Sequence, residues 1–558
     1  MEVARLRQWG IRLAGLLGPY ALLLGARLLI DSDWAPPRLV FSLLVYLGFA
    51  ALLNRWASVG IVTGLEGFLT HANWSKESLT GETLVARDVL EVSQGASLSS
   101  YLGWEMAAFA ALFVIALAIG VWKRPRFSWK RLALGLLLPA MLGLRLADAG
   151  PAGKAVNTVL SDVFKTHYLS YNFNENAKQN GIFAHLYFTA ESIKLPKRGP
   201  HDFYATAAAS VDPAPALAPE PDVALILCEA CFSTADDRFR TPIAKLAERG
   251  FTQSRVVSPV YGGGTSEAEF ELLAGLSSQV LPGVDYQNFG PDYRDGAESL
   301  ISHFKAAGYH TAGIHNFYGS FWKRDTVYRH FGFDEQHFIE TMDWHTRTWP
   351  SDALLYQRAL DVYAHLPAKQ KSFMFLVTVM THGAYRSSDE GETDYRNRLG
   401  AAVDEMQRFV TALEKRAKKR KRPVTIIVVG DHKPSLTSVF ARKGIFDRSY
   451  FRTTGTSNGD FRFAFKLTPA QYRVRGEVPV FIKASGKSAV DPAAMAARVA
   501  ERPMFCLSSE VARLANGKDR FWPTLAGICE RGPDALSRHG KAEWQQVFPL
   551  PLYAERLF

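Results

Sequence analysis

The chain has 558 residues, of which 47% are hydrophobic and 21% charged, and 65 Lys and Arg against 54 Asp and Glu leave a net charge of +11. So much apolar residue can bury a large core, which excludes a single small domain and wholesale disorder. Four cysteines are too few for a disulfide scaffold, and no second C-x-x-C pair completes a zinc ribbon. Any metal is therefore expected on carboxylates and histidines.

Four apolar runs stand out in the first part of the chain, at residues 14–30, 39–53, 101–122 and 132–146. Each is near the length that crosses about 30 Å of hydrocarbon. A cleaved signal peptide would account for the first run alone, and no convincing small-residue cleavage site follows it. The pattern predicts an all-α membrane domain over residues 1–150, whose cytoplasmic loops hold part of the basic excess.

Positive charges set the expected number of spans. Arg5, Arg7 and Arg12 place the N-terminus inside, and the loop 123–131 has five basic residues and no acid, which is typical of a cytoplasmic loop. Four spans would put that loop outside. We therefore expect five transmembrane helices, the additional one over residues 56–72, which are weakly apolar and include Glu66. Five spans deliver everything after about residue 150 to the outer face; the alternative is four spans with residues 56–72 re-entrant or interfacial.

Residues 151–221 are expected to connect the two main parts of the chain. The aromatic cluster at residues 183–188 favours a helix along the membrane surface, although packing on the outer domain is equally compatible. Residues 212–222 read D-P-A-P-A-L-A-P-E-P-D, and this Pro/Ala-rich composition is typical of an extended linker.

From residue 222 to 558, short β-rich runs alternate with helical segments. Strands are expected at residues 223–227, 311–314, 373–378 and 424–429, and helices near 242–249 and 397–415. This alternation predicts an α/β domain with a mainly parallel sheet covered by helices. The basic run 415–422 is interpreted as a solvated helix end rather than a nucleic-acid patch.

Polar residues follow each of these strands. In open α/β sheets, ligands bind outside the carboxyl ends of the strands. The residues at these positions are Glu229, His315, His382, Asp431 and His432. Any one of them alone would more often be a cap or a core residue, but two carboxylates and three imidazoles at one edge indicate a site for a divalent metal and a phosphate.

A candidate nucleophile is Thr265, which directly follows the glycine run 262–264. Ser266 and Glu269 have the spacing of a capping box, which predicts a helix that starts here. Free N–H groups and the helix dipole then favour an anionic phosphate beside Thr265. A threonine hydroxyl is a poor nucleophile, but coordination to a divalent cation lowers its pKa. The alternative is an ordinary glycine-rich loop with a helix cap.

These residues resemble the lipoteichoic acid synthase and periplasmic-glucan phosphoglycerol transferase family, a branch of the alkaline phosphatase/sulfatase superfamily. The shared motifs are the strand-ending Glu229, G-G-G-T-S-E-A-E-F at 262–270, His315 followed by F-W-K-R-D at 321–325, T-H at 381–382 and G-D-H at 430–432. The resemblance covers residues 222–435 by motif and the whole chain by layout. Lys323 departs from the small polar residue common there, and little is similar beyond about residue 440.

The resemblance also implies roles. Thr265 would be the nucleophile and His382 a catalytic proton carrier, and the metal ligands would be Glu229, Thr265, Asp431 and His432. The substrate would be bound by His315, Trp322, Arg324 and His382. The family uses one divalent cation, for which manganese is expected first and magnesium or zinc are alternatives.

By the same resemblance, the chain is expected to be a phosphoglycerol transferase of the bacterial cytoplasmic membrane, with its catalytic domain, residues 222–558, on the periplasmic side. It would move phosphoglycerol from phosphatidylglycerol to an envelope glycan or polymer through a phosphothreonine, and nucleic acid is not an expected partner. The main alternative is a phosphoethanolamine transferase, for which Asp325 is the candidate amine ligand. A sulfatase or phosphodiesterase is less favoured, because neither a C/S-x-P-x-R motif nor an Asp-Ser-Ala motif is present. A non-catalytic scaffold is less favoured, because every expected ligand position is occupied by a competent residue.

The four cysteines fall into two pairs along the outward domain. Cys506 and Cys529 are candidates for a disulfide, since that compartment is oxidising. Cys228 and Cys231 flank Glu229 and are expected to be buried thiols, with a cysteine metal ligand as the alternative.

Overall fold

The structure is a computed structural model that describes residues 18–26, 36–80, 83–90, 104–126, 128–146, 151–160, 166, 173–190, 195–199 and 217–558, the last range without 282–283, 285, 287–288, 345–348, 384, 387, 459–460, 465–466 and 532–546. The chain divides into two compact units. Unit 1 consists of Met1–Ser78 and Glu82–Lys194, and unit 2 of Leu79–Gly81 and Leu195–Phe558.

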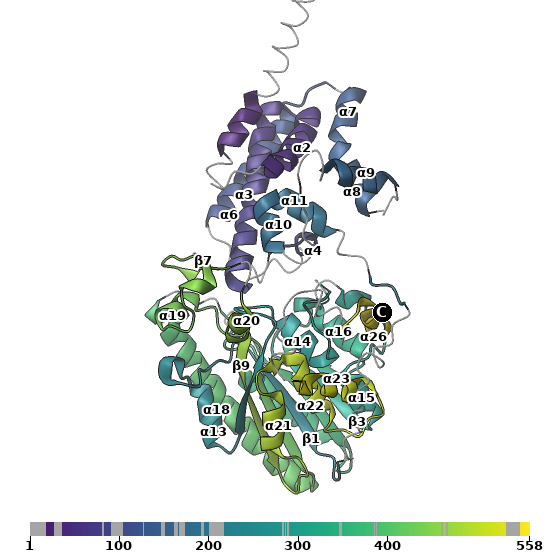
Figure 1. Cartoon of the computed structure of the whole chain (residues 1–558), viewed down its shortest axis with the longest axis vertical. Helices are drawn as coiled ribbons and strands as arrows, with labels where there is room; N and C mark the ends of the chain where they lie inside the picture. The colour runs from purple at the N-terminus through teal and green to yellow at the C-terminus, as the bar shows by residue number, and fades with distance from the viewer. Residues whose placement is uncertain are drawn as a thin grey trace, which may run out of the picture. The chain divides into compact units, whose positions relative to one another are not determined.

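The elements described in unit 1 are all helices (Figure 1). Its longer helices are α2 (Pro36–Leu52), α3 (Arg55–Thr80), α6 (Trp104–Trp122) and α8 (Leu137–Leu146). The shorter ones are α4 (Ala86–Leu90), α7 (Trp129–Gly135), α9 (Pro151–Thr158), α10 (Phe173–Asn180) and α11 (Ile182–Thr189). Helix α11 packs within this unit, because the ring of its Tyr187 lies 5.3 Å from that of Phe41 on α2.

The expected five spans are not confirmed. Among the described residues, α6 is the one helix that is long and apolar enough to cross a membrane, and α2 is apolar but shorter. The predicted run at 132–146 is divided between α7 and α8, where Pro139 cannot donate a hydrogen bond to the Gly135 carbonyl. The predicted run at 14–30 is described only over residues 18–26.

The additional span expected at residues 56–72 lies inside α3, which contacts both α2 and α6. Glu66 is buried, and the Ser42 hydroxyl of α2 donates to its carboxylate at 2.9 Å. Gly60 and Gly64 bring α3 against α6: a Cβ on Gly64 would lie 2.7 Å from the Phe113 backbone nitrogen, and one on Gly60 would lie 2.8 Å from the Ala116 Cβ. Such a G-x-x-x-G contact is common between membrane helices.

Unit 2 contains an eight-stranded sheet in the order β10-β2-β9-β6-β1-β5-β3-β4. Its strands are β1 (Asp222–Cys228), β2 (Thr252–Val257), β3 (Tyr309–His315), β4 (Glu335–His337), β5 (Lys371–Val377), β6 (Val424–Gly430), β9 (Glu477–Ser485) and β10 (Arg502–Pro503). Strand β1 is parallel to β5 and β6, and β9 is antiparallel to both its neighbours. The predicted α/β domain with a mainly parallel sheet is confirmed.

Helices cover both faces of this sheet (Figure 1). Val223, Leu225 and Leu227 of β1 face a core that includes α14 (Thr265–Ala274), α15 (Leu300–Ala306), α16 (Arg324–Phe331), α21 (Pro492–Val499), α22 (Met504–Ala512), α23 (Phe521–Glu530) and α26 (Leu550–Leu557). The alternate residues Ala224 and Ile226 face a second core with α13 (Lys245–Glu248), α17 (Asp352–His365), α18 (Asp389–Arg420) and α19 (Thr437–Arg442). A strand buried on both sides reads as a continuous apolar run, which is how β1 reads.

The register of the parallel strands places the site residues together. Cys228 pairs with Gly430, and Leu227 and His315 both pair with Val377. Glu229 and Asp431 therefore leave adjacent strands at the same edge, and His315 ends a strand on the other side of β5. This edge is where ligands are expected in an open parallel sheet.

Candidate functional site

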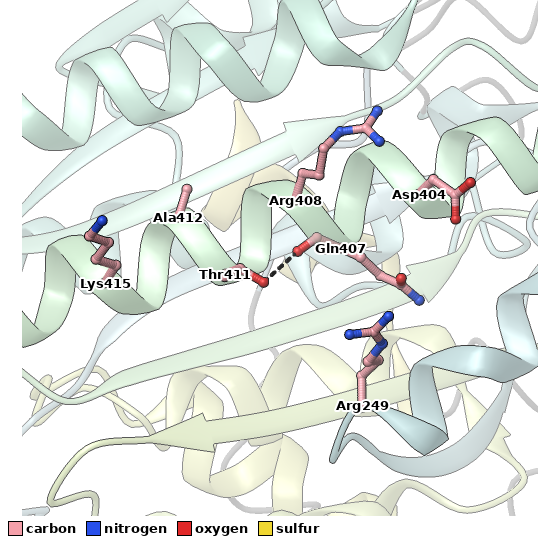
Figure 2. A pocket seen from close by; sticks show the side chains of 7 residues that line it. All are labelled: Arg249, Asp404, Gln407, Arg408, Thr411, Ala412 and Lys415. Atoms are coloured by element: carbon pink, nitrogen blue, oxygen red, sulfur yellow. Dashed lines mark hydrogen bonds between the residues drawn. The ribbon is translucent and has the colours of Figure 1, made fainter.

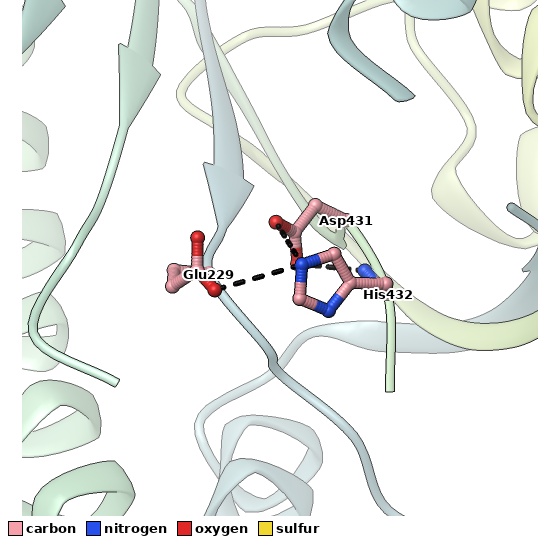
Figure 3. Close-up of side chains that lie close together, drawn as sticks. All are labelled: Glu229, Asp431 and His432. Carbon is pink, nitrogen blue, oxygen red and sulfur yellow. Dashed lines mark hydrogen bonds and ion pairs between the residues drawn. The ribbon is translucent and has the colours of Figure 1, made fainter. Parts of the chain in front are cut away.

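Three predicted metal ligands converge at this edge (Figure 3). Glu229, Asp431 and His432 each offer one ligand atom, and these atoms all lie within 4.8 Å of one another. His432 Nε2 is 3.2 Å from Asp431 Oδ2 and 3.6 Å from Glu229 Oε1. All three side chains are buried.

Backbone contacts aim these side chains. Asp431 Oδ1 accepts hydrogen bonds from the backbone N–H groups of Ala230 and His432 at 2.7 and 2.6 Å, while its Oδ2 faces the cluster. His432 Nδ1 lies 2.9 Å from the Lys433 carbonyl, so Nδ1–H donates there and Nε2 is left toward the carboxylates. Histidines that bind metals are commonly oriented in this way.

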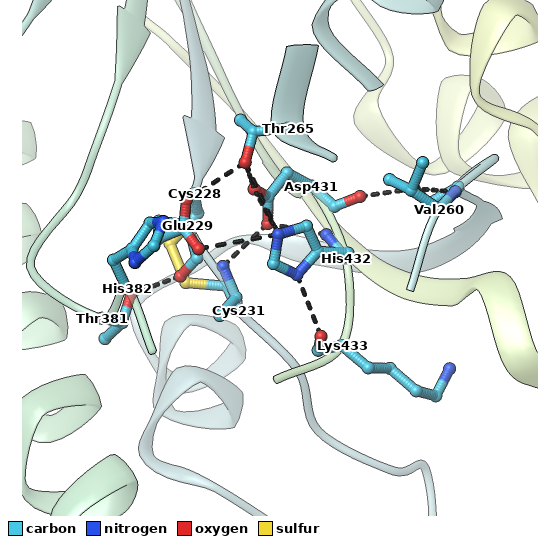
Figure 4. A network of polar contacts seen from close by, with 12 residues as sticks. Cys228, Glu229, Cys231, Val260, Thr265, Thr381, His382, Asp431, His432 and Lys433 are labelled. Atoms are coloured by element: carbon cyan, nitrogen blue, oxygen red, sulfur yellow. Dashed lines mark hydrogen bonds and ion pairs between the residues drawn. A yellow bond between two sulfur atoms is a disulfide. The ribbon is translucent and has the colours of Figure 1, made fainter. Parts of the chain in front are cut away.

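Thr265 is the first residue of α14 and completes the cluster (Figure 4). Its Oγ1 lies 2.7 Å from Asp431 Oδ2, 3.3 Å from Glu229 Oε2 and 3.5 Å from His432 Nε2. The preceding Gly264 has φ +86°, and a Cβ there would come within 2.8 Å of the Val260 side chain. Glycine is thus required for the turn that delivers Thr265 to the carboxylates.

The predicted capping box is wrong, although the helix does start at Thr265. Gly264 is the N-cap and makes no side-chain cap. Glu269 lies instead in the core: Arg324 Nε donates to its Oε2 at 2.9 Å, and the Tyr328 hydroxyl donates to its Oε1 at 2.6 Å. The Arg324 guanidinium from α16 makes a charge-assisted hydrogen bond to the carboxylate, which is stronger than one from a neutral backbone N–H group.

The charge balance of the cluster fits a divalent cation. Burial and the neighbouring Asp431 carboxylate hold the pKa of Glu229 well above its usual range. Two buried carboxylates side by side are costly unless a positive charge offsets them. The four side chains Glu229, Thr265, Asp431 and His432 supply two carboxylates, a hydroxyl and an imidazole, a donor set compatible with Mn, Mg or Zn.

Arg324 is buried, and only part of its guanidinium is paired. Nε is bonded to Glu269, whereas the buried Nη1 has no hydrogen-bond partner in the described part of the chain. Its positive charge acts on Glu229, His315 and His382, so it lies within electrostatic range of all three. A buried guanidinium with an unpaired N–H group is suited to bind a phosphate oxygen.

The two remaining predicted histidines are held in one tautomer by backbone carbonyls. His315 Nδ1 lies 2.8 Å from the Val377 carbonyl, and His382 Nδ1 lies 2.9 Å from that of Gly383. Burial lowers the pKa of His315 well below its usual value and that of His382 to about 4. Both rings are therefore neutral at neutral pH, and each keeps Nε2 as an acceptor.

The segment 321–325 is only partly brought to the site. Trp322 and Lys323 have φ of +59° and +54°, so two successive non-glycine residues adopt the left-handed region just before α16. Such conformations are costly and cluster at functional sites. Within the described residues, Trp322 and Asp325 make no hydrogen bond or ring contact with the metal-site residues; the ring of Trp322 lies 5.2 Å from that of Phe321.

Several supporting residues escaped the sequence analysis. The Trp349 ring lies 4.2 Å from that of His382. Thr378 accepts a hydrogen bond from the Glu229 N–H at 2.9 Å, and the Thr381 hydroxyl donates to the Glu229 carbonyl. The string T-V-M-T-H at 378–382 was the available signal, because hydroxyls just after a strand often bond to neighbouring backbone.

The expectation of thiols at Cys228 and Cys231 is wrong. These residues form a disulfide that brackets Glu229, and neither sulfur is free to bind a metal (Figure 4). Backbone pairing brings the two residues together, because the Cys231 N–H donates to the Cys228 carbonyl at 3.3 Å. Cys506 on α22 and Cys529 on α23, which the sequence offered as candidates for a disulfide, form the second one.

A pocket of about 490 Å³ lies elsewhere, along the outer side of α18 (Figure 2). Its lining includes Arg249, Arg408 and Lys415 with a single carboxylate, Asp404. None of the site residues lines it; Arg408 and Lys415 belong to α18, and Arg249 follows α13.

Unit 2 is thus an α/β domain in which a buried threonine hydroxyl and a group of acidic and histidine side chains that could hold a metal ion meet at the carboxyl ends of parallel strands. Residues 232–504 match the sulfatase family. The resemblance predicted from the motifs is confirmed over this part of the chain.

A curated relative and several solved structures are also similar. A protein of Rhizobium meliloti (strain 1021), provisionally named a cyclic beta-1,2-glucan modification protein, is 31% identical over 248 residues. That match covers 40% of this chain and 37% of the relative, so the chain matches little more than a third of the relative's length.

Among solved structures, the lipoteichoic acid synthase LtaP of Listeria monocytogenes is 16% identical with a TM-score of 0.43, and the match covers 57% of this chain and 78% of that one. The Streptococcus pyogenes phosphoglycerol transferase GacH, in complex with sn-glycerol-1-phosphate, is 16% identical with a TM-score of 0.42, over 64% and 91% of the two chains. The periplasmic domain of Escherichia coli EcEptC, in complex with Zn, is 16% identical with a TM-score of 0.37, over 54% and 84%.

Proposed function

We propose that the chain is a phosphoglycerol transferase that moves phosphoglycerol from phosphatidylglycerol to a hydroxyl of an envelope glycan through a phosphothreonine at Thr265. The observation that carries this proposal is the position of Thr265 Oγ1, which begins α14 and lies 2.7 Å from Asp431 Oδ2 and 3.3 Å from Glu229 Oε2. A hydroxyl held among metal-ligand carboxylates at a helix N-terminus is placed to attack a phosphodiester.

In the first step, the Oγ1–P bond forms and the P–O bond to diacylglycerol breaks. Thr265 loses one proton in this step, and the departing diacylglycerol oxygen takes up one proton, so the protons balance. A divalent cation on Glu229, Thr265, Asp431 and His432 would lower the pKa of the hydroxyl and offset charge on the phosphate. Arg324 directs its unpaired Nη1–H to a non-bridging oxygen, and Trp322 forms a wall for the glycerol.

In the second step, an acceptor hydroxyl attacks the phosphothreonine and restores Thr265. His382 takes the acceptor proton on Nε2, which is unprotonated at pH 7 because burial lowers the pKa of the ring to about 4. His315 holds the phosphate while this exchange occurs. The scheme predicts ping-pong kinetics, with diacylglycerol released before the acceptor reacts.

The membrane setting forms part of the proposal, with a membrane domain at 1–150, a connector at 151–221 and a periplasmic catalytic domain at 222–558. Support comes from the apolar α6 and its close glycine contact with α3. The two disulfides of unit 2 suit an oxidising compartment. A membrane anchor raises the effective concentration of lipid head groups at the site. A glucan acceptor is favoured by the name of the Rhizobium meliloti relative.

Mass spectrometry of the intact protein tests this proposal. Purified chain with Mn²⁺ is incubated with phosphatidylglycerol or phosphatidylethanolamine, and Thr265→Ala is the control. A phosphoglycerol adduct mapped to Thr265 is the expected result. A phosphoethanolamine adduct would replace the donor, and the absence of any adduct with the cation bound would overturn the mechanism.

A further inference from the structure

Aromatic rings join the two histidines of the site into one continuous cluster. Ring centroids are 6.3 Å apart for His315 and Phe317, 5.2 Å for Phe317 and Trp349, and 4.2 Å for Trp349 and His382. Phe317 also lies 5.1 Å from Tyr318 and 5.3 Å from Phe321, which contacts Trp322. Phe317, Tyr318, Phe321, Trp322 and Trp349 are together termed the aromatic platform.

The platform extends from the site to solvent. Phe317 is buried, Phe321, Trp322 and Trp349 are half-buried, and Tyr318 is 43% exposed. Across the described residues of unit 2, the only other large hydrophobic side chain with such exposure is Leu195. Tyr318 is thus one of two exposed large apolar side chains among the described residues of unit 2, and its ring contacts Phe317, whose own ring lies 6.3 Å from that of His315. Exposed aromatic side chains next to a reaction centre commonly contact a ligand.

We propose that the aromatic platform binds a sugar ring of a neutral glucan acceptor, with Tyr318 as its outer contact. This inference rests on the proposed function and names the acceptor side of the same site. One face of a hexose presents C–H groups, which pack on the electron-rich face of an aromatic ring. Tyr318 and Trp349 both contact Phe317, and Trp349 also contacts His382, so a sugar held on the platform would lie near the residue proposed to take the proton from the acceptor hydroxyl.

The composition of the platform favours a sugar over the acyl chain of the lipid donor. Acyl chains pack on aliphatic surface, and in the described part of unit 2 no Leu, Ile, Val or Met is found among the exposed large hydrophobic side chains apart from Leu195. Tyrosine and tryptophan combine an apolar ring with a polar edge, which suits a ligand with C–H faces and hydroxyl rims.

The experiment separates the two half-reactions on the full chain. In the first step, Tyr318→Ala is incubated with phosphatidylglycerol and Mn²⁺, and the amount of adduct on Thr265 is measured. In the second step, cyclic beta-1,2-glucan is added, and the rate at which the adduct decays is measured as a function of glucan concentration. Tyr318→Phe keeps the ring, and Leu195→Ala removes a side chain of similar exposure elsewhere. We expect adduct formation within twofold of wild type, and about a tenfold rise in the glucan concentration for half-maximal transfer in Tyr318→Ala alone.

Other outcomes overturn the inference in distinct ways. If adduct decay in Tyr318→Ala depends on glucan concentration as it does in wild type, the platform does not bind the acceptor, and the proposed function still stands. A loss of adduct formation in that variant, with an unchanged melting temperature, would assign the ring to the lipid donor. If wild type forms no adduct, the proposed function fails. Sugar binding by the platform is then tested separately, by calorimetric titration of wild type and Tyr318→Ala with the glucan. Equal binding by the two proteins, or no binding by either, would contradict the inference that the platform binds the glucan.

Discussion

Arg324 and Glu269 form an ion pair inside unit 2, with Nε 2.9 Å from Oε2 and both side chains at most 2% exposed. The pair links α16, which begins at Arg324, to α14, which begins at Thr265. The same two helices therefore present the proposed nucleophile and the proposed phosphate ligand. Glu269 binds Nε of the guanidinium, whereas Nη1 has no hydrogen-bond partner among the described residues.

Replacing Glu269 should cost both stability and catalysis. Glu269→Ala leaves a buried, unpaired guanidinium, for which a loss of about 3–5 kcal/mol in the free energy of unfolding is typical. We expect this loss in urea denaturation, with a large drop in adduct formation at Thr265. Glu390→Gln is the control, because its pair with Arg386 is exposed and should contribute little. A wild-type stability for Glu269→Ala would contradict the structural role of the pair.

Removing one metal-site charge should weaken cation binding without unfolding the domain. Asp431→Asn keeps a side-chain oxygen for the N–H groups of Ala230 and His432 but loses the charge of Oδ2. We expect at least a tenfold lower Mn²⁺ affinity by calorimetric titration with the metal alone, in line with the effect of changed metal ligands and their supports. The exposed Asp404→Asn is the control. Equal affinity in wild type and Asp431→Asn would argue that the cation binds elsewhere.

The disulfide between Cys228 and Cys231 should support the metal site, because it closes the loop that contains Glu229. In that loop the Ala230 N–H donates to Asp431, and Ala230 has φ +49°. The double variant Cys228→Ala/Cys231→Ala should bind Mn²⁺ several-fold more weakly, as measured by titration with the metal alone.

The second disulfide is the matched control for this prediction. Cys506→Ala/Cys529→Ala opens a link across a sequence separation of 23. It should lower the free energy of unfolding by about 3 kcal/mol and leave Mn²⁺ affinity unchanged. Equal metal affinity in the two double variants would show that the first disulfide does not position Glu229. Mass mapping of free thiols in wild type accompanies both measurements.

Glu271 should make stability depend on pH. It is buried in α14, and burial raises its pKa to about 8, although the Ser278 N–H and hydroxyl donate to it. The pKa of Glu271 is 4.5 in the unfolded chain, so between pH 4.5 and about pH 8 the folded state keeps a proton that the unfolded chain has lost. The contribution of Glu271 to the free energy of unfolding is therefore complete below pH 4.5 and is lost as pH rises through 8. Each unit of pKa difference corresponds to about 1.4 kcal/mol.

Glu271→Gln tests this dependence, because the amide oxygen can accept the same hydrogen bonds but does not titrate. The stability of the variant relative to wild type should rise between pH 5 and pH 8, as measured by urea denaturation. Glu248→Gln, on an exposed helix end, should run parallel to wild type over this range. A difference between Glu271→Gln and wild type that does not change with pH would contradict the shift.

The local sequence specified the central strands well, because buried parallel strands read as unbroken apolar runs. Residues 223–227 and 424–429 were expected as strands and lie in β1 and β6. Strand β2 has the half-exposed sequence T-Q-S-R-V-V, and β9 is antiparallel, so neither follows the pattern of an alternating βα unit. Helix α18 spans Asp389–Arg420 and is longer than the expected helix at 397–415. It begins earlier because the Ser388 side chain caps its first turn.

The sequence by itself determined the residues at the strand ends, Glu229, Asp431 and His432, because a strand buried on both faces must place its next polar residue at the sheet edge. It also indicated Thr265 as a candidate, because this residue directly follows a glycine run at the start of a helix. Only the tertiary structure decided the partner of Glu269, the pairing of Cys228 with Cys231, and the contact of Trp349 with His382. Each of these joins side chains whose meeting depends on how helices and loops pack, and packing across a sheet is not encoded in local spacing.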